Sequence, residues 1–175
     1  MKRILAMKPV AVLVSLAVIL SGIAADALAC TGLAVKNADG TVVHGRTVEF
    51  AVPVSAASVF VPRGYAFTGS LPGGGEGMRY TSKYACVGSV SYGVPAIMDG
   101  MNEKGLSTGA FYFPTCAGYA PVTDANKSIA VSAVEFTNWI LTQFATLDEV
   151  RAAVEGGQVA IVPTPVKGWG RRRRP

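Results

Sequence analysis

Cys30 is the residue whose type and position most strongly suggest chemistry. It follows Ala27-Leu28-Ala29, a small-residue pattern that signal peptidase cleaves, so removal of residues 1–29 would leave Cys30 at the start of the mature chain. A free α-amino group has a pKa of about 8 and can act as the general base for the thiol of its own residue. The sequence therefore predicts a cysteine nucleophile whose base is its own amine.

Two charged residues are predicted to lie beside Cys30, because a β-hairpin returns the chain to it. The segments on either side of Asn37-Ala38-Asp39-Gly40 read as strands, and the Asp-Gly pair suits a hairpin turn. Pairing across this turn places Arg46 and Glu49 within roughly 10 Å of Cys30. A cation such as Arg46 favours a thiolate. A carboxylate such as Glu49 can orient the amine and hold the arginine in place.

Other common catalytic chemistries are not indicated by the sequence. His44 is the only histidine, and its place in an apolar strand pattern favours a structural role. No cluster of histidines and cysteines has metal-ligand spacing, and Gly73-Gly74-Gly75 lacks the Lys-Ser/Thr of a phosphate-binding loop. We therefore expect no metal and no organic cofactor. A disulfide between Cys86 and Cys116 is left open, because sequence cannot show whether the geometry fits.

The first 29 residues predict export. Lys2, Arg3 and Lys8 precede a largely apolar run and then the cleavage motif, which is typical of a secretory signal peptide. We expect a periplasmic or secreted protein with no stable membrane association after cleavage. Two alternatives are a retained transmembrane anchor and a lipoprotein whose Cys30 is acylated by lipid. Acylation of the amine would remove the base, so the lipoprotein and the nucleophile exclude each other.

The formal net charge of +5 arises at the two ends of the chain. Besides the basic residues of the leader, the segment 168–175 contains Arg171 to Arg174 and differs in composition from the rest. Without these ends the charges nearly balance, so no nucleic-acid surface is expected. The segment 168–175 is interpreted either as a solvated basic tail or as the product of a frameshift or truncation.

The remaining pattern places strands first, then two helices and a last strand. Apolar runs typical of strands occupy residues 57–62, 84–90, 96–98, 107–113 and 159–162. Helical periodicity covers 129–145, and a second helix begins with the capping box of Thr146 and Glu149 and ends at Gly156. Residues 69–77 are predicted to be a surface loop. This order indicates an α+β layered domain.

Three segments together resemble the choloylglycine hydrolase family, which contains bile salt hydrolases and penicillin V acylases. They are Cys30-Thr31-Gly32-Leu33, the segment from Gly45 to Phe50, and Asp99-Gly100-Met101-Asn102-Glu103-Lys104-Gly105-Leu106. The likeness runs from Cys30 to about residue 166, so residues 30–167 are assigned to one domain. The resemblance implies an αββα sandwich of the N-terminal-nucleophile (Ntn) hydrolases, which cleaves linear amides through a thioester.

The resemblance also implies roles for individual residues. Cys30 matches the nucleophile and Arg46 the first active-site arginine, whereas Glu49 stands where the family usually has aspartate. Tyr112 matches a position that helps form the oxyanion hole, and tyrosine there is more typical of penicillin acylases than of bile salt hydrolases. The alternative for Tyr112 is an ordinary strand aromatic. The stretch from Asp99 to Leu106 is turn-like, and Asn102–Leu106 are expected to form a structural turn without a direct chemical role.

Family members are roughly twice as long, and the resemblance implies that their later half supplies an oxyanion asparagine and another arginine. We therefore expect only the N-terminal portion of the sandwich here, with an uncovered apolar face and weak activity. The expected partner is a small acyl amide, which could be a penicillin, a conjugated bile salt or an acyl-homoserine lactone. Family members also suggest a homo-oligomer. The rival interpretations are a lipid-anchored envelope protein and a non-functional fragment.

Overall fold

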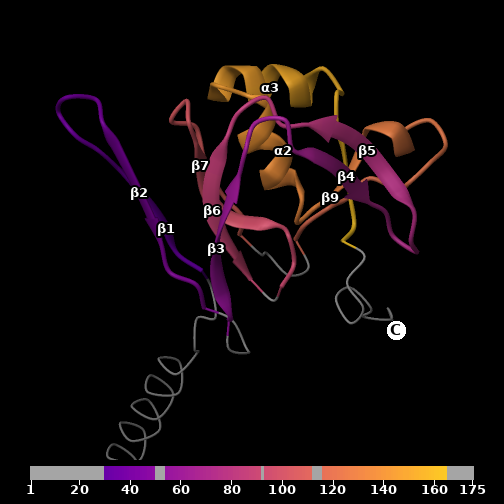
Figure 1. Cartoon of the computed structure of the whole chain (residues 1–175), viewed down its shortest axis with the longest axis horizontal. Coiled ribbons are helices and arrows are strands. Elements are labelled where there is room, and N and C mark those ends of the chain that lie inside the picture. The colour runs from indigo at the N-terminus through magenta and orange to yellow at the C-terminus, as the bar shows by residue number, and fades with distance from the viewer. Residues whose placement is uncertain (1–29, 50–53, 92, 112–115, 165–175) are drawn as a thin grey trace, which may run out of the picture.

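The computed structural model describes residues 30–49, 54–91, 93–111 and 116–164 (Figure 1). The predicted leader 1–29, Tyr112 and the tail 168–175 lie outside the described residues. Within those ranges, no helix has both the length and the apolar character needed to cross a membrane.

The centre of the fold is an antiparallel sheet of four strands in the order β3-β6-β7-β8. Its strands are β3 (Ala56–Val61), β6 (Cys86–Ser91), β7 (Ile97–Asn102) and β8 (Ser107–Gly109). Three predicted strands, 57–62, 84–90 and 96–98, correspond to β3, β6 and the start of β7. The strand predicted at 107–113 is described only as far as β8. The predicted turn at 99–106 begins too early, because Asp99–Asn102 pair with β6 and belong to β7.

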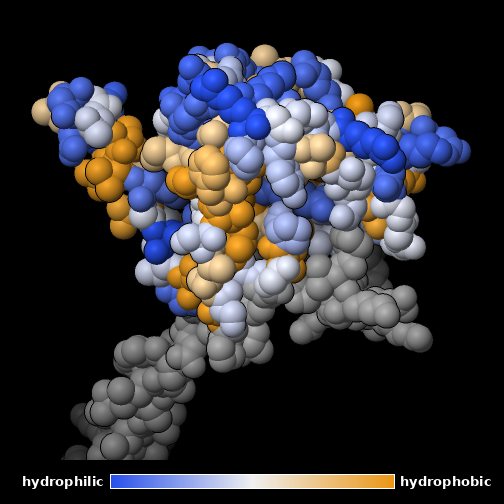
Figure 2. Space-filling view, in the orientation of Figure 1, coloured by the Kyte–Doolittle hydropathy of each residue, from blue (hydrophilic) through white to orange (hydrophobic). Residues whose placement is uncertain are grey.

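The helix α2 (Phe136–Gln143) packs against β7 and β8 on one face of this sheet. Its fully buried Leu141 joins a core cluster with Val61, Cys86 and Ile97. Three apolar side chains that project from the sheet outside this cluster are exposed, and Figure 2 shows apolar surface on this part of the molecule. They form the cross-strand row Phe60, Val87 and Met101, with exposed fractions of 64%, 55% and 46%. The expected uncovered apolar surface is thus present.

The predicted N-terminal hairpin is confirmed and projects from the body of the molecule (Figure 1). β1 (Gly32–Lys36) pairs with β2 (Val42–Arg46), and Gly32 lies opposite Arg46. In the turn, Gly40 has a φ of 89°, and the Asp39 carboxylate accepts a hydrogen bond from the Thr41 N–H at 2.8 Å. The hairpin's apolar side chains are also largely exposed; they are Leu33, Val35, Val42 and Val43.

A second hairpin occupies the region that was predicted to be a loop. β4 (Ala66–Ser70) and β5 (Glu76–Thr81) pair, so residues 69–70 and 76–77 are in strands and the prediction of a loop over 69–77 is wrong. The glycines are needed in the turn, where Gly73 and Gly74 have φ values of 84° and 92°. A glycine at position 77 permits close packing, since a Cβ there would lie 2.2 Å from the Ala130 carbonyl oxygen.

The helix predicted over 129–145 begins later than expected. A 3₁₀ turn, η1 (Lys127–Ile129), is followed by β9 (Ala130–Ser132), which pairs in parallel with β10 (Ala160–Val162). The Glu135 carboxylate accepts hydrogen bonds from the backbone N–H groups of Ser70 and Ser132, which ties this connection to β4 before α2 starts. The apolar spacing of the segment could not distinguish a buried strand from a helical turn.

The second helix and the last strand are confirmed. α3 (Leu147–Glu155) begins after Thr146, whose hydroxyl accepts from the Glu149 N–H at 3.3 Å. The Glu149 carboxylate accepts from the Ala145 N–H, one residue earlier than in a standard capping box. Strands, helices and a short parallel pair therefore make an α+β fold.

All three cysteines are free. Cys86 is buried, and its desolvation raises the pKa of its thiol, whereas Cys116 is exposed. The disulfide that the sequence left open is therefore not formed.

Asn102 fixes the turn between β7 and β8, as expected for a structural role. It is 4% exposed, its amide nitrogen donates to the carbonyls of Leu141 and Phe144, and its amide oxygen accepts from the N–H groups of Lys104 and Leu106. Replacing it by alanine leaves these groups unpaired. We expect Asn102→Ala to lower the free energy of unfolding by about 2–4 kcal/mol. Urea denaturation followed by tryptophan fluorescence measures this; a loss below about 0.5 kcal/mol would show that water replaces the amide.

Stability at acidic pH should depend on Glu103. Its carboxylate pairs with Arg63 and accepts from the Ala85 N–H, and these contacts, the arginine first, lower the pKa of Glu103 from 4.5 to about 2. A pKa lowered on folding adds stability that is present above the unfolded value and lost as the pH falls toward the folded value. Between pH 4.5 and about 2, Glu103→Gln should therefore lose less stability than the unmodified chain. Urea midpoints across this range test it, with Asp124→Asn as a matched surface control; parallel curves would refute it.

Candidate active site

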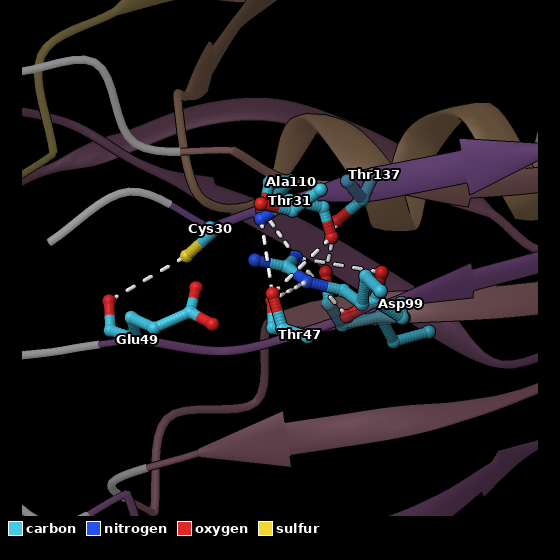
Figure 3. A network of polar contacts seen from close by, with 9 residues as sticks. Cys30, Thr31, Thr47, Glu49, Asp99, Ala110 and Thr137 are labelled. Carbon is cyan, nitrogen blue, oxygen red and sulfur yellow. Dashed lines mark hydrogen bonds and ion pairs between the residues drawn. The ribbon is translucent and has the colours of Figure 1, made fainter. Parts of the chain in front are cut away.

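Cys30 lies at one end of the β1–β2 ladder. One more backbone pair extends the ladder past β1, with the Thr47 N–H donating to the Thr31 carbonyl at 2.9 Å. The Thr31 N–H donates to the Thr47 hydroxyl at 3.1 Å. Cys30 follows directly, half-buried, and its thiol contacts the Glu49 carbonyl oxygen at 3.6 Å (Figure 3). The predicted proximity of Cys30 and Glu49 is thus found.

Glu49 carries a buried oxygen that is available for a new contact. Its Oε2 has no hydrogen-bond partner within the described part of the chain. A buried, unpaired carboxylate oxygen is costly unless a donor reaches it. Figure 3 shows Cys30 and Glu49 facing each other across the two chain segments. Glu49 thus contacts the Cys30 thiol through its backbone carbonyl and keeps a buried carboxylate oxygen close to that contact.

Arg46 is buried and fixed from several sides. Its side chain is 7% exposed, and its Nη1 donates to the Ala110 carbonyl at 2.5 Å and to the Asp99 carboxylate at 3.1 Å. Its Nε donates to the Thr47 carbonyl at 3.2 Å, and its guanidinium lies 4.4 Å from the centre of the Phe111 ring. The expectation that Glu49 holds this arginine is wrong, since the carboxylate that pairs with it is Asp99.

Asp99 is the site residue that sequence reasoning missed. It lies on β7, and its side chain is 23% exposed. Burial raises its pKa, and the nearby Arg46 opposes that shift. Arg46 and Asp99 are far apart in the sequence, and no local sequence pattern indicates that they form a pair. The signal that could have found Asp99 is its position as the first residue of the Asp-Gly-Met-Asn segment, which was interpreted as a turn.

Glycines make room for this ion pair. A Cβ at Gly32, opposite Arg46, would lie 2.4 Å from the Phe111 ring. A Cβ at Gly109 would lie 2.6 Å from the Asp99 carboxylate and 3.4 Å from the His44 ring. Both positions therefore need glycine for Arg46, Asp99 and Phe111 to pack as they do.

The other candidates add little to this geometry. Tyr112 lies outside the described residues, so its predicted contribution to an oxyanion hole stays a prediction. His44 lies on β2 beside the Asp99 carboxylate and has no part in the contacts of Cys30 that the structure describes. Among the described residues, no group of histidine, cysteine and acidic side chains is arranged to hold a metal ion.

Comparison with known protein families matches residues 30–167 to the linear amide C–N hydrolases, choloylglycine hydrolase family. The chain belongs to this family. Members of the family are hydrolases of linear amides, and the matched segment begins at Cys30. The resemblance seen in the sequence is therefore confirmed.

Individual relatives agree with this assignment. The chain is 28% identical to a bile salt hydrolase/transferase of Clostridium perfringens over 136 residues, covering 77% of this chain and 40% of that protein. It is also 28% identical to a bile salt hydrolase/transferase of Bifidobacterium longum, covering 79% of this chain and 42% of the relative. The chain thus spans about two fifths of the length of these relatives.

The structure matches that of penicillin V acylase from Agrobacterium tumefaciens with a TM-score of 0.65 and 27% sequence identity. The match covers 75% of this chain and 39% of the acylase. It confirms the α+β fold of the Ntn hydrolases that the resemblance implied.

Proposed function

We propose that the chain carries the nucleophilic half of a linear amide hydrolase, in which Cys30 becomes the N-terminal residue and attacks the amide carbonyl. The observation that carries this proposal is the contact between the Cys30 thiol and the Glu49 segment, beside a buried carboxylate oxygen without a partner in the described residues. The family match supports it, because the matched residues start at Cys30. Export and removal of residues 1–29 are part of the proposal.

The reaction would proceed in two displacements. The Cys30 thiol gives its proton to the free α-amine, and the sulfur attacks the carbonyl carbon of the substrate. The C–N bond then breaks, and the leaving nitrogen takes the proton from the ammonium, which leaves a thioester on sulfur. Water attacks the thioester with the amine as base, the C–S bond breaks, and the acid and the free thiol are released.

Glu49 would orient the amine. An ammonium at the start of the mature chain is a donor, and Glu49 Oε2 is a buried acceptor with no partner in the described part of the chain. A charge-assisted hydrogen bond between them would satisfy that oxygen and turn the amine toward the thiol. Glutamate is one methylene longer than the aspartate usual at this family position, so its carboxylate reaches further from the backbone than an aspartate would.

The substrate and the level of activity form the finer part of the proposal. Relatives are a penicillin V acylase and bile salt hydrolase/transferases, so a phenoxyacetyl amide and a conjugated bile salt are the substrates to test. Because the chain spans about two fifths of these relatives, we expect both the acylation of Cys30 and the turnover to be slow.

Amine release from penicillin V and from a glycine-conjugated bile salt tests the proposal. The chain is expressed with its leader and purified from the exported fraction, and its N-terminus is identified by mass spectrometry. We expect a free Cys30 and a slow release of amine that approaches one amine per chain with at least one substrate. A diacylglycerol group on sulfur would support the lipoprotein instead. A folded, processed chain that releases no amine would contradict the proposed function.

A further inference from the structure

We propose that Asp99 is the positioning residue of this site: it holds the Arg46 guanidinium in the orientation that the Cys30 reaction needs. This inference rests on the proposed function of Cys30. Asp99 does not touch the thiol in the structure, so it would act through Arg46.

The geometry of the ion pair supports a positioning role. Both carboxylate oxygens of Asp99 lie near the same nitrogen of Arg46, at 3.1 and 3.4 Å, and that nitrogen also donates to the Ala110 carbonyl. The Phe111 ring lies against the guanidinium at 4.4 Å from its centre. Asp99 and Ala110 therefore set the direction of one nitrogen, while Phe111 supports the plane of the group.

Arg46 lies on the same face of the hairpin as Cys30. Paired residues of an antiparallel ladder share a face, and alternate residues return to it. Arg46 pairs with Gly32, and Cys30 is two residues before Gly32. The ladder continues through Thr31 and Thr47, so this alternation extends to the position of Cys30. A shift of the Arg46 guanidinium would therefore move a positive charge on the face of the hairpin that carries the nucleophile.

The residues around Asp99 favour its ion pair with Arg46. The buried side chain of Arg46 needs a charged partner, because an isolated buried charge is strongly disfavoured. Arg46 is the cation that forms an ion pair with Asp99 in the described part of the chain. His44 approaches from β2, and Gly109 on β8 leaves the space that the carboxylate fills. A methyl group at position 109 would push the carboxylate aside without removing a charge.

Three substitutions and one control separate positioning from general stability. Asp99→Asn keeps the shape and removes the charge, Asp99→Glu keeps the charge and moves it, and Gly109→Ala displaces the carboxylate. Asp124→Asn makes the same chemical change at a side chain that is 99% exposed and pairs with Lys127 on the surface. Circular dichroism and thermal unfolding establish that each variant is folded at the assay temperature.

The first measurement is the rate at which phenylglyoxal modifies Arg46, followed by peptide mass spectrometry. Arg63, Arg79 and Arg151 are exposed and serve as internal references in the same sample. We expect modification of Arg46 to be at least about fivefold faster in folded Asp99→Asn and Gly109→Ala than in the unmodified chain, since charge-assisted hydrogen bonds are roughly twice as strong as neutral ones. Asp124→Asn should leave the rate unchanged. Equal protection of Arg46 in Asp99→Asn would overturn the positioning role.

The second measurement is single-turnover acylation of Cys30 at several substrate concentrations. Asp99→Asn should lower the limiting rate about 10–100-fold while the half-saturating concentration changes less than about threefold, and Asp99→Glu should recover part of the rate. If phenylglyoxal modifies Arg46 faster in Asp99→Asn but the limiting rate of Cys30 acylation is unchanged, the inference is overturned. If the unmodified chain is not acylated, the proposed function fails. The phenylglyoxal rates would still show whether Asp99 positions Arg46.

Discussion

Cys30→Ser in the processed chain is expected to lower the acylation rate by about 10³-fold or more. The proposed base is an amine with a pKa of about 8, which can deprotonate a thiol but is poorly matched to an alcohol. The substitution replaces one atom in a half-buried position, so the fold should not change. Acid-quenched samples analysed by intact mass give the fraction of acylated chain against time.

Cys116→Ser is the matched control for this result. Cys116 is also a free cysteine, and it is exposed, so a reagent that labels any accessible thiol would react there first. Acylation should be unchanged in Cys116→Ser and nearly absent in Cys30→Ser. The opposite pattern would show that the labelling reflects accessibility and that Cys30 is not the nucleophile.

Arg46→Met is expected to lower the free energy of unfolding by about 3–5 kcal/mol, the usual effect of breaking a buried ion pair from one side. Methionine fills the space but leaves the Asp99 carboxylate and the Ala110 carbonyl without their donor. It also removes the guanidinium that lies against Phe111. Chemical denaturation near neutral pH, where Asp99 is charged in the unfolded chain, measures the loss.

The double variant Arg46→Met, Asp99→Asn tests the cause. If the loss comes mainly from the stranded carboxylate, neutralising Asp99 should restore about 1–3 kcal/mol of it. A double variant as unstable as the sum of the two single variants would assign the loss to packing against Phe111, and the ion pair would then have little energetic role.

The parts of the site that are local in sequence could be predicted from it. The Asp39-Gly40 turn predicts that β1 and β2 pair and that the chain returns to Cys30, with a register uncertain by one residue; the structure sets this register, with Arg46 opposite Gly32 and Glu49 beside Cys30. This short turn is therefore the main sequence feature that predicts the proximity of Arg46 and Glu49 to Cys30. The capped start of α3 at Thr146 was predictable for the same reason.

The parts that depend on contacts between distant segments could not be predicted. Asp99 meets Arg46 only because the central sheet places β7 beside the base of the hairpin, and its short motif was indistinguishable from a turn. The strand β9 has the apolar spacing of a helix, and its pairing with β10 becomes visible only when the chain is folded. In both places tertiary pairing overrides the local pattern.

Peptide mapping of the mature chain after a rapid acid quench with substrate shows directly whether Cys30 is the N-terminal nucleophile. We expect the first peptide to begin at Cys30 with a free α-amine and to carry the acyl group as a thioester on its sulfur. A first peptide that begins elsewhere, an amine blocked by lipid, or an acyl group found only on Cys116 would contradict it.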